Sequence, residues 1–380
     1  MDFNFTEEQV AIQDSLRRFL TKDYGFEQRR AIAKSADGFS RGAWATYAEL
    51  GLLALPFSEE HGGLGGNSVD AMIVMETLGT NLALEPYLAT VVVAGSLIAD
   101  VGSDAQRDTL LGGITGGELL VSLAHQEPGA RYNRQHVATS AKKEGDGYVL
   151  NGHKAVVLGA PSADRLLVSA RTSGAAFDAN GITLFVVDPK AAGVTVTGYT
   201  TQDGQRAGEV VLKNVKVGAD AVLGQVDGAL AGIERAIDRG IAGLCAEAVG
   251  IMAALNATTL DYLKQRKQFG VPIGKFQALQ HRMAEMAIAA EQSRSMATLA
   301  ALRADSTDAA ERSRAVSGAK AYIGQSLRKV GQDAVQMHGG MGVTDELMAA
   351  HYFKRLTIIN STFGDTDHHL ARFSDTLLVA

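Results

Sequence analysis

The chain has 380 residues, of which 46% are hydrophobic and 21% are charged, as is typical of a globular protein with a sizeable core. A net charge of −6 argues against nucleic acid or an anionic membrane as the main partner, and the single cysteine, Cys245, excludes an intramolecular disulfide and a zinc cluster. No apolar run reaches transmembrane length, and the acidic N-terminal segment is unlike a secretory signal. We therefore expect a soluble, cytoplasmic protein of about two to three domains.

Residues 1–118 are expected to form an N-terminal helical domain. Thr6 followed by Gln9 is a capping box, and apolar residues follow it at helical spacing. Further helices fit residues 40–50 and 68–81, which are separated by a glycine-rich loop.

Residues 119–226 are expected to form a middle β domain, because short β-rich runs separated by turn residues begin here. The runs include 136–141, 148–150 and 155–158, and Glu144-Gly-Asp-Gly147 is a hairpin turn between two of the runs. Several short strands at this spacing favour a small antiparallel β-barrel or sandwich.

Residues 227–380 are expected to be helical again. Three long helices fit 227–266, 275–304 and 307–337, and two shorter helices follow them. Their apolar faces suit an antiparallel four-helix bundle. The whole chain is therefore predicted to have an α+β multidomain fold.

The turn between the first two long helices carries groups that suit a nucleotide cofactor. The Arg266 guanidinium matches a pyrophosphate, and the Phe269 ring and the Gln277 amide suit an adenine. An ordinary helix–turn–helix with a solvated arginine explains the same residues.

This turn, Arg-x-x-Phe-Gly-x-x-Ile-x-x-Phe-Gln, resembles the corresponding turn of the acyl-CoA dehydrogenase family, and the resemblance extends over almost the whole chain. It implies an FAD cofactor that is held partly by a neighbouring subunit. Three further segments resemble flavin contacts of the family. They are Gln126-Glu-Pro-Gly-Ala130, Gln336-Met-His-Gly-Gly-Met-Gly342 and Phe363-Gly-Asp-Thr-Asp-His368. The cofactor-binding residues that the resemblance implies are Gln126, Arg266, Phe269, Gln277, Gln336, Gly339, Gly340, Thr366 and His368.

The chain also departs from the family pattern beside the flavin. After Asn151-Gly-His-Lys154 the family usually has a tryptophan and a threonine, where this chain has Val156 and Leu158. Arg131-Tyr-Asn133 replaces the usual Gly-Ser-Asp. Several flavin contacts are therefore lost or changed.

The dehydrogenation that the resemblance implies needs a carboxylate to take the Cα proton of the acyl thioester while Cβ passes a hydride to the flavin. Most members of the family take this base from a Glu whose position here is Gly364, and a minority take it from a position that is Gly240 here. Asp365 is the nearest substitute. The same aspartate would also serve as the cap of a helix that starts near Thr366.

Other polar groups near these positions are expected to point elsewhere. Glu234 and Asp238 precede Gly240, but helical spacing turns them away from its direction. Adjacent helix residues point about 100° apart, so we expect His368 and His369 to share no metal ion.

The family includes heterotetramers in which one chain lacks the base, and the closer resemblance is to the small subunit of pimeloyl-CoA dehydrogenase. It is carried by Leu84–Thr90, His351–Thr357 and Phe363–Asp365. This implies a small subunit that acts on an acyl-CoA with a partner chain, and an electron-transfer flavoprotein as acceptor. Three alternatives remain: a homotetrameric dehydrogenase with Asp365 as base, a flavin monooxygenase or oxidase on the same fold, and a non-catalytic partner subunit.

Overall fold

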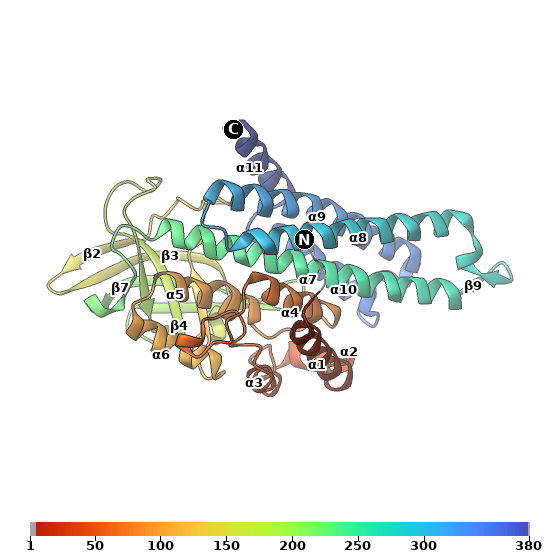
Figure 1. Ribbon diagram of the computed structural model, residues 1–380, viewed down its shortest axis with the longest axis horizontal. Coiled ribbons are helices and arrows are strands. Elements are labelled where there is room, and N and C mark those ends of the chain that lie inside the picture. The colour runs from red at the N-terminus through yellow and green to blue at the C-terminus, as the bar shows by residue number, and fades with distance from the viewer. Residues whose placement is uncertain (1–4, 379–380) are drawn as a thin grey trace. The chain divides into compact units, whose positions relative to one another are not determined.

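The computed structural model describes residues 5–378. Their order along the chain is helical, then β, then helical, as the colours of Figure 1 show, which confirms the predicted α+β fold class. Contacts within the chain group these residues into two compact units, which are described one at a time. Unit 1 consists of residues 5–31, 68–83 and 241–378, and unit 2 of residues 32–67 and 84–240.

Unit 1 is built from long helices. They are α1 (Glu7–Asp23), α2 (Phe26–Lys34, which ends in unit 2), α4 (Ser68–Thr80), α7 (Leu230–Gln265, which begins in unit 2), α8 (Gln277–Ala304), α9 (Ala309–His338), α10 (Met348–Ser361) and α11 (Thr366–Leu378). The predicted capping box is confirmed, since the Thr6 hydroxyl accepts the Gln9 N–H and the Gln9 side chain accepts the Thr6 N–H. The three long helices expected in this region are α7, α8 and α9.

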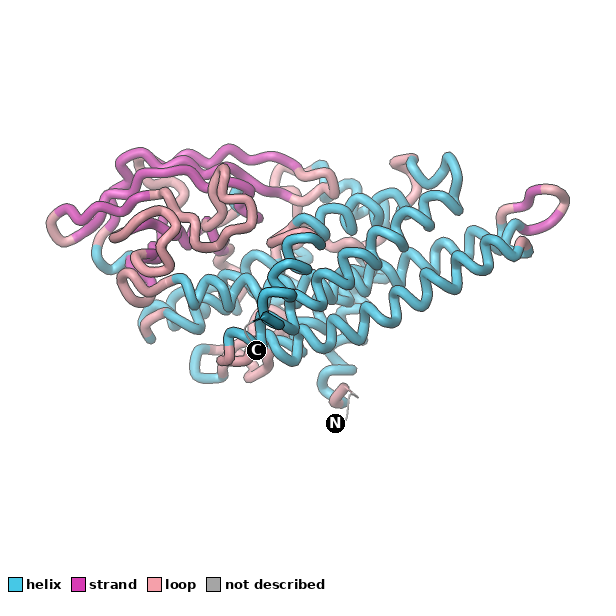
Figure 2. The backbone as a smooth tube through the Cα atoms, turned by 90° about the horizontal axis from the view of Figure 1, so that it is seen from above, coloured by secondary structure: helices cyan, strands magenta, loops and turns pink. Residues whose placement is uncertain are grey.

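Helix α9 is the centre of the bundle, because α8, α10 and α11 all pack against it. The long helices run side by side in both ribbon views (Figures 1 and 2), and the Asn256 amide of α7 donates to the Met286 carbonyl of α8. Helices α4 and α7 approach closely at two glycines. A Cβ at Gly79 or Gly250 would overlap the main chain of the facing helix, so these two positions admit no larger residue.

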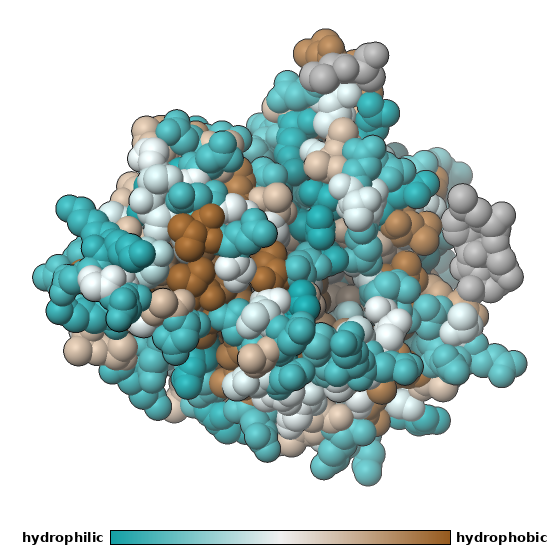
Figure 3. All heavy atoms as spheres, turned by 60° about the vertical axis from the view of Figure 1, so that its left-hand side comes forward, coloured by the Kyte–Doolittle hydropathy of each residue, from teal (hydrophilic) through white to brown (hydrophobic). Residues whose placement is uncertain are grey.

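The expectation that no segment reaches transmembrane length needs a correction. Helix α7 is long and apolar enough to cross a membrane by length and composition alone. However, 78% of its most apolar stretch is buried inside the protein, as in the core helix of a globular domain. On the face shown in Figure 3, apolar side chains gather only in small patches on a largely hydrophilic surface.

Unit 2 contains the sheet and the shorter helices. The helices are α3 (Arg41–Glu49), α5 (Ser96–Val101), which continues a buried π-helix (Leu88–Gly95), and α6 (Asp104–Thr115). The strands are β1 (Val121–Ala124), β2 (Ser140–Glu144), β3 (Gly147–Leu158), β4 (Arg165–Arg171), β5 (Ile182–Val187), β6 (Val194–Thr200), β7 (Arg206–Val217) and β8 (Val222–Leu223). They appear as neighbouring magenta segments in Figure 2.

The finer prediction of a small antiparallel barrel is not confirmed. The described strands follow an open path, β6-β7-β3-β2-β4-β5-β8, and β1 joins the edge of β4. β1 and β2 both run parallel to β4. Parallel strands need a crossover connection, which the β2–β3 hairpin provides between β1 and β4, and β3 provides between β2 and β4. The sheet is therefore mixed.

Two strand predictions also change. The predicted turn at residues 144–147 is confirmed, with Gly145 at φ +59°, but the two runs after it are one strand, β3, with irregular pairing to β7 after Leu150 and after Lys154. The run 136–141 becomes a strand only from Ser140. Its preceding backbone N–H groups are taken elsewhere, those of Ala138 and Thr139 by the Glu127 carboxylate.

A buried ion pair joins α7 to α10 inside unit 1. The Arg355 guanidinium donates to both oxygens of Glu247, each at 2.6 Å, and both side chains are nearly inaccessible. Removing one member of such a pair leaves the other charge buried and uncompensated.

We predict that Arg355→Met destabilises the protein by about 3–5 kcal/mol, and that Glu247→Leu in addition recovers much of the loss, because the second change removes the orphaned carboxylate. Urea unfolding of both variants measures this. Lys216→Met, which breaks the exposed pair with Glu144, is the control and should leave the midpoint unchanged. Equal midpoint shifts for Arg355→Met and the control would contradict the prediction.

Candidate functional site

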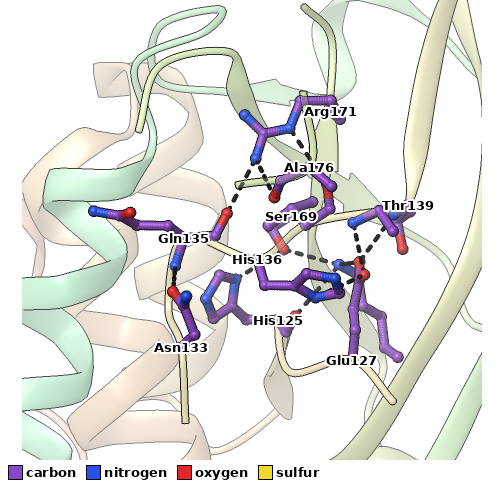
Figure 4. A network of polar contacts seen from close by, with 12 residues as sticks. His125, Glu127, Asn133, Gln135, His136, Thr139, Ser169, Arg171 and Ala176 are labelled. Carbon is purple, nitrogen blue, oxygen red and sulfur yellow. Dashed lines mark hydrogen bonds and ion pairs between the residues drawn. The ribbon is translucent and has the colours of Figure 1, made fainter. Parts of the chain in front are cut away.

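A buried polar network underlies the Gln126–Ala130 segment in unit 2 (Figure 4). The Lys154 ammonium of β3 lies 2.6 Å from the Glu127 carboxylate and also donates to the Ser169 hydroxyl and the His125 carbonyl. The Glu127 carboxylate in turn accepts the N–H groups of residues 138 and 139. The ring of His125 contacts the same serine hydroxyl at 2.9 Å. This network fixes the main chain on both sides of Gln126.

The charges of this network are set by burial and by each other. Burial would raise the pKa of Glu127, but the charge of Lys154 and the hydrogen bonds to the carboxylate outweigh it and bring the pKa to about 2. Burial outweighs the attraction of Glu127 on the lysine and lowers the pKa of Lys154 to about 8. Burial and the neighbouring ammonium lower the pKa of His125 to about 3. At neutral pH the pair is therefore ionised and the histidine is neutral.

Arg171 at the end of β4 orders the loops beside this network. Its guanidinium donates only to main-chain carbonyls, and Figure 4 shows two of them, those of Gln135 and Ala176. The other three acceptors are the carbonyls of Val137, Asp178 and Asn180. The five N–H groups of Arg171 thus link the segment after Ala130 to the β4–β5 loop through hydrogen bonds to both.

The irregular part of β3 places Val156 at the surface. This valine has φ +52° and is 45% exposed, and its N–H donates to the Glu209 carboxylate of β7. The preceding N–H, from Ala155, donates to the Gln126 carbonyl at 2.8 Å, so Gln126 is tied directly to this part of the strand. Val156 offers a flavin much less contact area than the tryptophan usual at this position in the family.

Asp238 was expected to point away from Gly240, and its side chain pairs with an arginine from another segment. Asp238 is fully buried on α7, and its carboxylate accepts the Arg134 guanidinium at 2.8 Å. This carboxylate is therefore engaged in an ion pair inside the protein.

In unit 1, the turn between α7 and α8 forms a small hairpin of β9 (Lys267–Gln268) and β10 (Val271–Pro272) that projects beyond the helix ends (Figures 1 and 2). Arg266, Phe269 and Gln277 are all exposed, the Phe269 ring by 91%. Phe269 contacts another ring, that of Phe276, edge-on at 6.1 Å. The hairpin thus presents these side chains to solvent.

The Gln336–Gly342 segment lies at the same end of the bundle. The Tyr262 ring of α7 stacks against His338 at 4.5 Å, and its hydroxyl donates to the His338 carbonyl. Gln336, Gly339 and Gly340 are exposed, and a Cβ at either glycine would meet no atom within 4 Å. The glycine loop thus begins against the last turn of α7, just before the hairpin.

The third cluster is the turn between α10 and α11. The Asp365 carboxylate accepts the His368 N–H at 2.9 Å and caps α11, so the capping interpretation is confirmed. The Thr366 hydroxyl donates to Asn360, and the His368 ring packs against His369 at 5.0 Å. Gly364 has φ +119°, and a Cβ there would lie 2.5 Å from the Nε2 atom of His369. Whether Asp365 acts as a base stays a prediction.

These clusters suit different parts of a long ligand. Gly324 of α9 faces Thr366 of the α10–α11 turn, and the glycine loop begins at Gly339, where α9 ends. At a rise of about 1.5 Å per residue along α9, the turn and the glycine loop are about 22 Å apart. The exposed arginine, aromatic ring, amides and unobstructed glycines fit the nucleotide part of FAD. They lie on an outer surface, so a cofactor bound there needs a second surface to cover it. No group of three or more potential metal ligands occurs in residues 5–378.

Sequence reasoning missed the buried cations. Glu127 and Lys154 lie inside the motifs that carried the resemblance, but no role was assigned to either. Lys320 lies on the apolar face of α9 between Val316 and Ile323. For the two lysines, a charged residue on an otherwise apolar face was the available signal, whereas Glu127 lies in a loop and offered no such signal.

We predict that Glu127→Gln costs about 3–5 kcal/mol at pH 7, because Lys154 is then buried without a counter-charge. The folded pKa of about 2 lies below the ordinary 4.5, so the stabilisation is present above pH 4.5 and is lost as the pH falls toward 2. Urea unfolding should therefore show a smaller difference from the wild type at pH 3 than at pH 7. Glu144→Gln is the exposed control, and an unchanged difference at pH 3 would refute the assignment.

We predict that Gly364→Ala destabilises the protein by about 2–4 kcal/mol, because the methyl group meets the His369 ring at an unfavourable φ. Gly145→Ala is the matched control. It also has a positive φ but no atom within 4 Å, so it should cost only about 1–2 kcal/mol. Thermal unfolding compares them, and equal losses would mean that the turn has room for a side chain.

Three family models match consecutive parts of the chain. The N-terminal, middle and C-terminal domains of acyl-CoA dehydrogenase match residues 6–118, 122–215 and 230–378. Among curated relatives, the 3-(aryl)acrylate reductase of Clostridium sporogenes is 30% identical over 355 residues, which cover 91% of this chain and 93% of that protein.

Solved structures share the fold over the full length. The ChsE4–ChsE5 complex from Mycobacterium tuberculosis has a TM-score of 0.90 at 26% identity, with 100% of both chains covered. Butyryl-CoA dehydrogenase from Megasphaera elsdenii has a TM-score of 0.91 at 26% identity with the same coverage. The chain therefore belongs to the acyl-CoA dehydrogenase family and is an FAD-dependent oxidoreductase of that family.

Proposed function

We propose that this chain is the small subunit of a heteromeric dehydrogenase that converts an acyl-CoA thioester to the trans-2-enoyl-CoA. In this reaction FAD, when bound, accepts the hydride from Cβ while a carboxylate takes the proton from Cα. The carboxylate would come from a second, dehydrogenase-like chain. This chain would contribute a nucleotide-binding surface and part of the flavin wall.

The closed turn at Gly364 carries the proposal. Gly364 occupies the position of the usual base, and the rings of His368 and His369 fill the space that a side chain would take. Asp365, the neighbouring carboxylate, is used as the cap of α11. A carboxylate that accepts a backbone N–H at the start of a helix is held there by that hydrogen bond. Both features favour a base supplied by another chain over a homotetramer that uses Asp365.

The exposed nucleotide groups support an assembly. Arg266 and Phe269 are exposed at the α7–α8 hairpin, and Gly339 and Gly340 follow His338, which contacts Tyr262 near the end of α7. Both glycines are unobstructed, so a second subunit could enclose a cofactor against these groups. The arginine would pair with the pyrophosphate, and the glycine main chain would let phosphate oxygens approach. The ChsE4–ChsE5 complex is named for two chains, which makes a heteromer a reasonable expectation for a protein of the same fold.

Resemblance alone suggests the substrate and the acceptor. The likeness to pimeloyl-CoA dehydrogenase favours a dicarboxylic or otherwise bulky acyl-CoA. One similar solved structure is titled as a glutaryl-CoA dehydrogenase with glutaryl-CoA, and one relative as a subunit of a caffeyl-CoA reductase–Etf complex. We propose an electron-transfer flavoprotein as the acceptor.

The test is anaerobic titration with a panel of acyl-CoAs, monitored at the visible flavin band. We expect no bleaching of this chain alone, and bleaching when it is co-purified with a glutamate-bearing dehydrogenase-like chain encoded beside it. In that complex Asp365→Asn should leave the rate within about twofold, because asparagine also caps a helix. Replacing the partner's glutamate with glutamine should abolish bleaching.

Asp367→Asn on the same helix is the matched control for Asp365→Asn. Bleaching of the isolated chain that disappears only with Asp365→Asn would replace the heteromer with a self-sufficient enzyme that uses Asp365. Oxygen consumption without an enoyl product would favour a monooxygenase or oxidase. Unchanged FAD retention in Arg266→Ala would contradict the pairing of this arginine with the pyrophosphate. A chain that keeps no flavin, alone or in the complex, would be a non-catalytic partner.

A further inference from the structure

Lys320 of α9 is a buried lysine whose hydrogen-bond acceptors are all main-chain carbonyls. Its side chain is 1% exposed, and its Nζ atom lies 2.7 Å from the Ile359 carbonyl and 3.0–3.1 Å from those of Asn360, Thr362 and Gly364. An ammonium group has three N–H donors, so four acceptors use its capacity completely.

The four carbonyls belong to one short segment. Helix α10 ends at Ser361, so its last carbonyls have no partner within the helix. The carbonyls of Thr362 and Gly364 belong to the turn that leads into α11. Between them, the Phe363 carbonyl accepts the ring of His369 at 3.1 Å. A lysine from α9 and a histidine from α11 thus hold the turn from two sides.

The groups around Lys320 leave its ammonium protonated at neutral pH. Burial lowers the pKa of Lys320 to about 8, the nearby Cys245 and Asp365 act to raise it, and Arg355 acts to lower it. All three N–H donors are therefore present near pH 7.

We infer that Lys320 is a positioning residue that locks the Asn360–Asp365 turn by gathering its carbonyls around one ammonium group. The lock holds Gly364 at φ +119° with the two histidine rings against it, and it holds Asp365 where its carboxylate caps α11. The Lys320 hydrogen bonds then hold the turn in the conformation that leaves no room for a side chain at Gly364. Its bearing on acyl-CoA chemistry rests on the proposed function, whereas the lock itself does not.

Amide hydrogen exchange of the apo chain tests the lock without FAD, acyl-CoA or a partner, so its failure and that of the proposed function are distinguishable. The reporters are the Thr362 amide, which donates to Ile358 at the end of α10, and the His368 and His369 amides, which donate to Asp365 at the start of α11, so they flank the turn on both sides. Lys320→Met keeps the length of the side chain but removes the donors. We expect exchange at the reporters to rise about tenfold or more, as for the loss of one charge-assisted hydrogen bond.

The global unfolding midpoint is a poor reporter, because methionine also removes the cost of burying the charge. Lys329→Met is the matched control on the same helix, where Lys329 is half-exposed and pairs with Glu285 and Asp333, and it should leave the reporters unchanged. An unchanged rate at the reporters in Lys320→Met, or an equal rise throughout the bundle, would overturn the lock.

A second variant distinguishes the effect of the ammonium N–H donors from the effect of filling the space that the lysine side chain occupies. Lys320→Ala removes a fragment equivalent to n-propylammonium, so adding n-propylammonium chloride should slow exchange at the reporters at least about threefold relative to sodium chloride. n-Propanol at the same concentration fills the same space with one donor and no charge, and it should have little effect. Equal slowing by both compounds, or by neither, would overturn the inference.

Discussion

A cation inside a protein is tolerated only when its donors meet acceptors, and this constraint organises both units of the chain. In unit 2 the Lys154 ammonium meets Glu127, and Arg171 meets five carbonyls. In unit 1 Arg355 meets Glu247, and Lys320 meets four carbonyls. In each case the acceptors come from other elements or loops, so satisfying one charge fixes the path of a distant segment.

Two of these buried cations hold segments that carry predicted site residues. The Glu127–Lys154 pair fixes the segment that carries Gln126, and Lys320 fixes the turn that carries Gly364 and Asp365. The groups suited to the cofactor are instead exposed, as Arg266 and Phe269 are. A rigid interior and an open outer surface are what a subunit needs if it builds its site only when it meets another surface.

Local signals predicted the elements well, and contacts between distant segments caused the differences. The capping box at Thr6 and the turn at Gly145 depend on neighbouring residues, and both are confirmed. The first part of the run 136–141 is not a strand, since Glu127, eleven or more residues earlier, accepts the N–H groups of Ala138 and Thr139. The antiparallel barrel was not confirmed because strand direction depends on which distant strands pair, and periodicity carries no information about that choice.

The order of helical and β regions, the family and the cofactor were predictable from the amino-acid sequence, because they follow from local pattern and from motifs that resemble those of the family. That Gly240 and Gly364 stand at the base positions of the family stays a prediction from the same resemblance. The use of the charges depends instead on contacts between distant residues. The tertiary structure showed that Asp365 caps a helix, that Gly364 is closed by two rings, and that Lys154 and Lys320 are buried among acceptors. A side chain's environment depends on residues far away in the chain, and no local pattern contains that information.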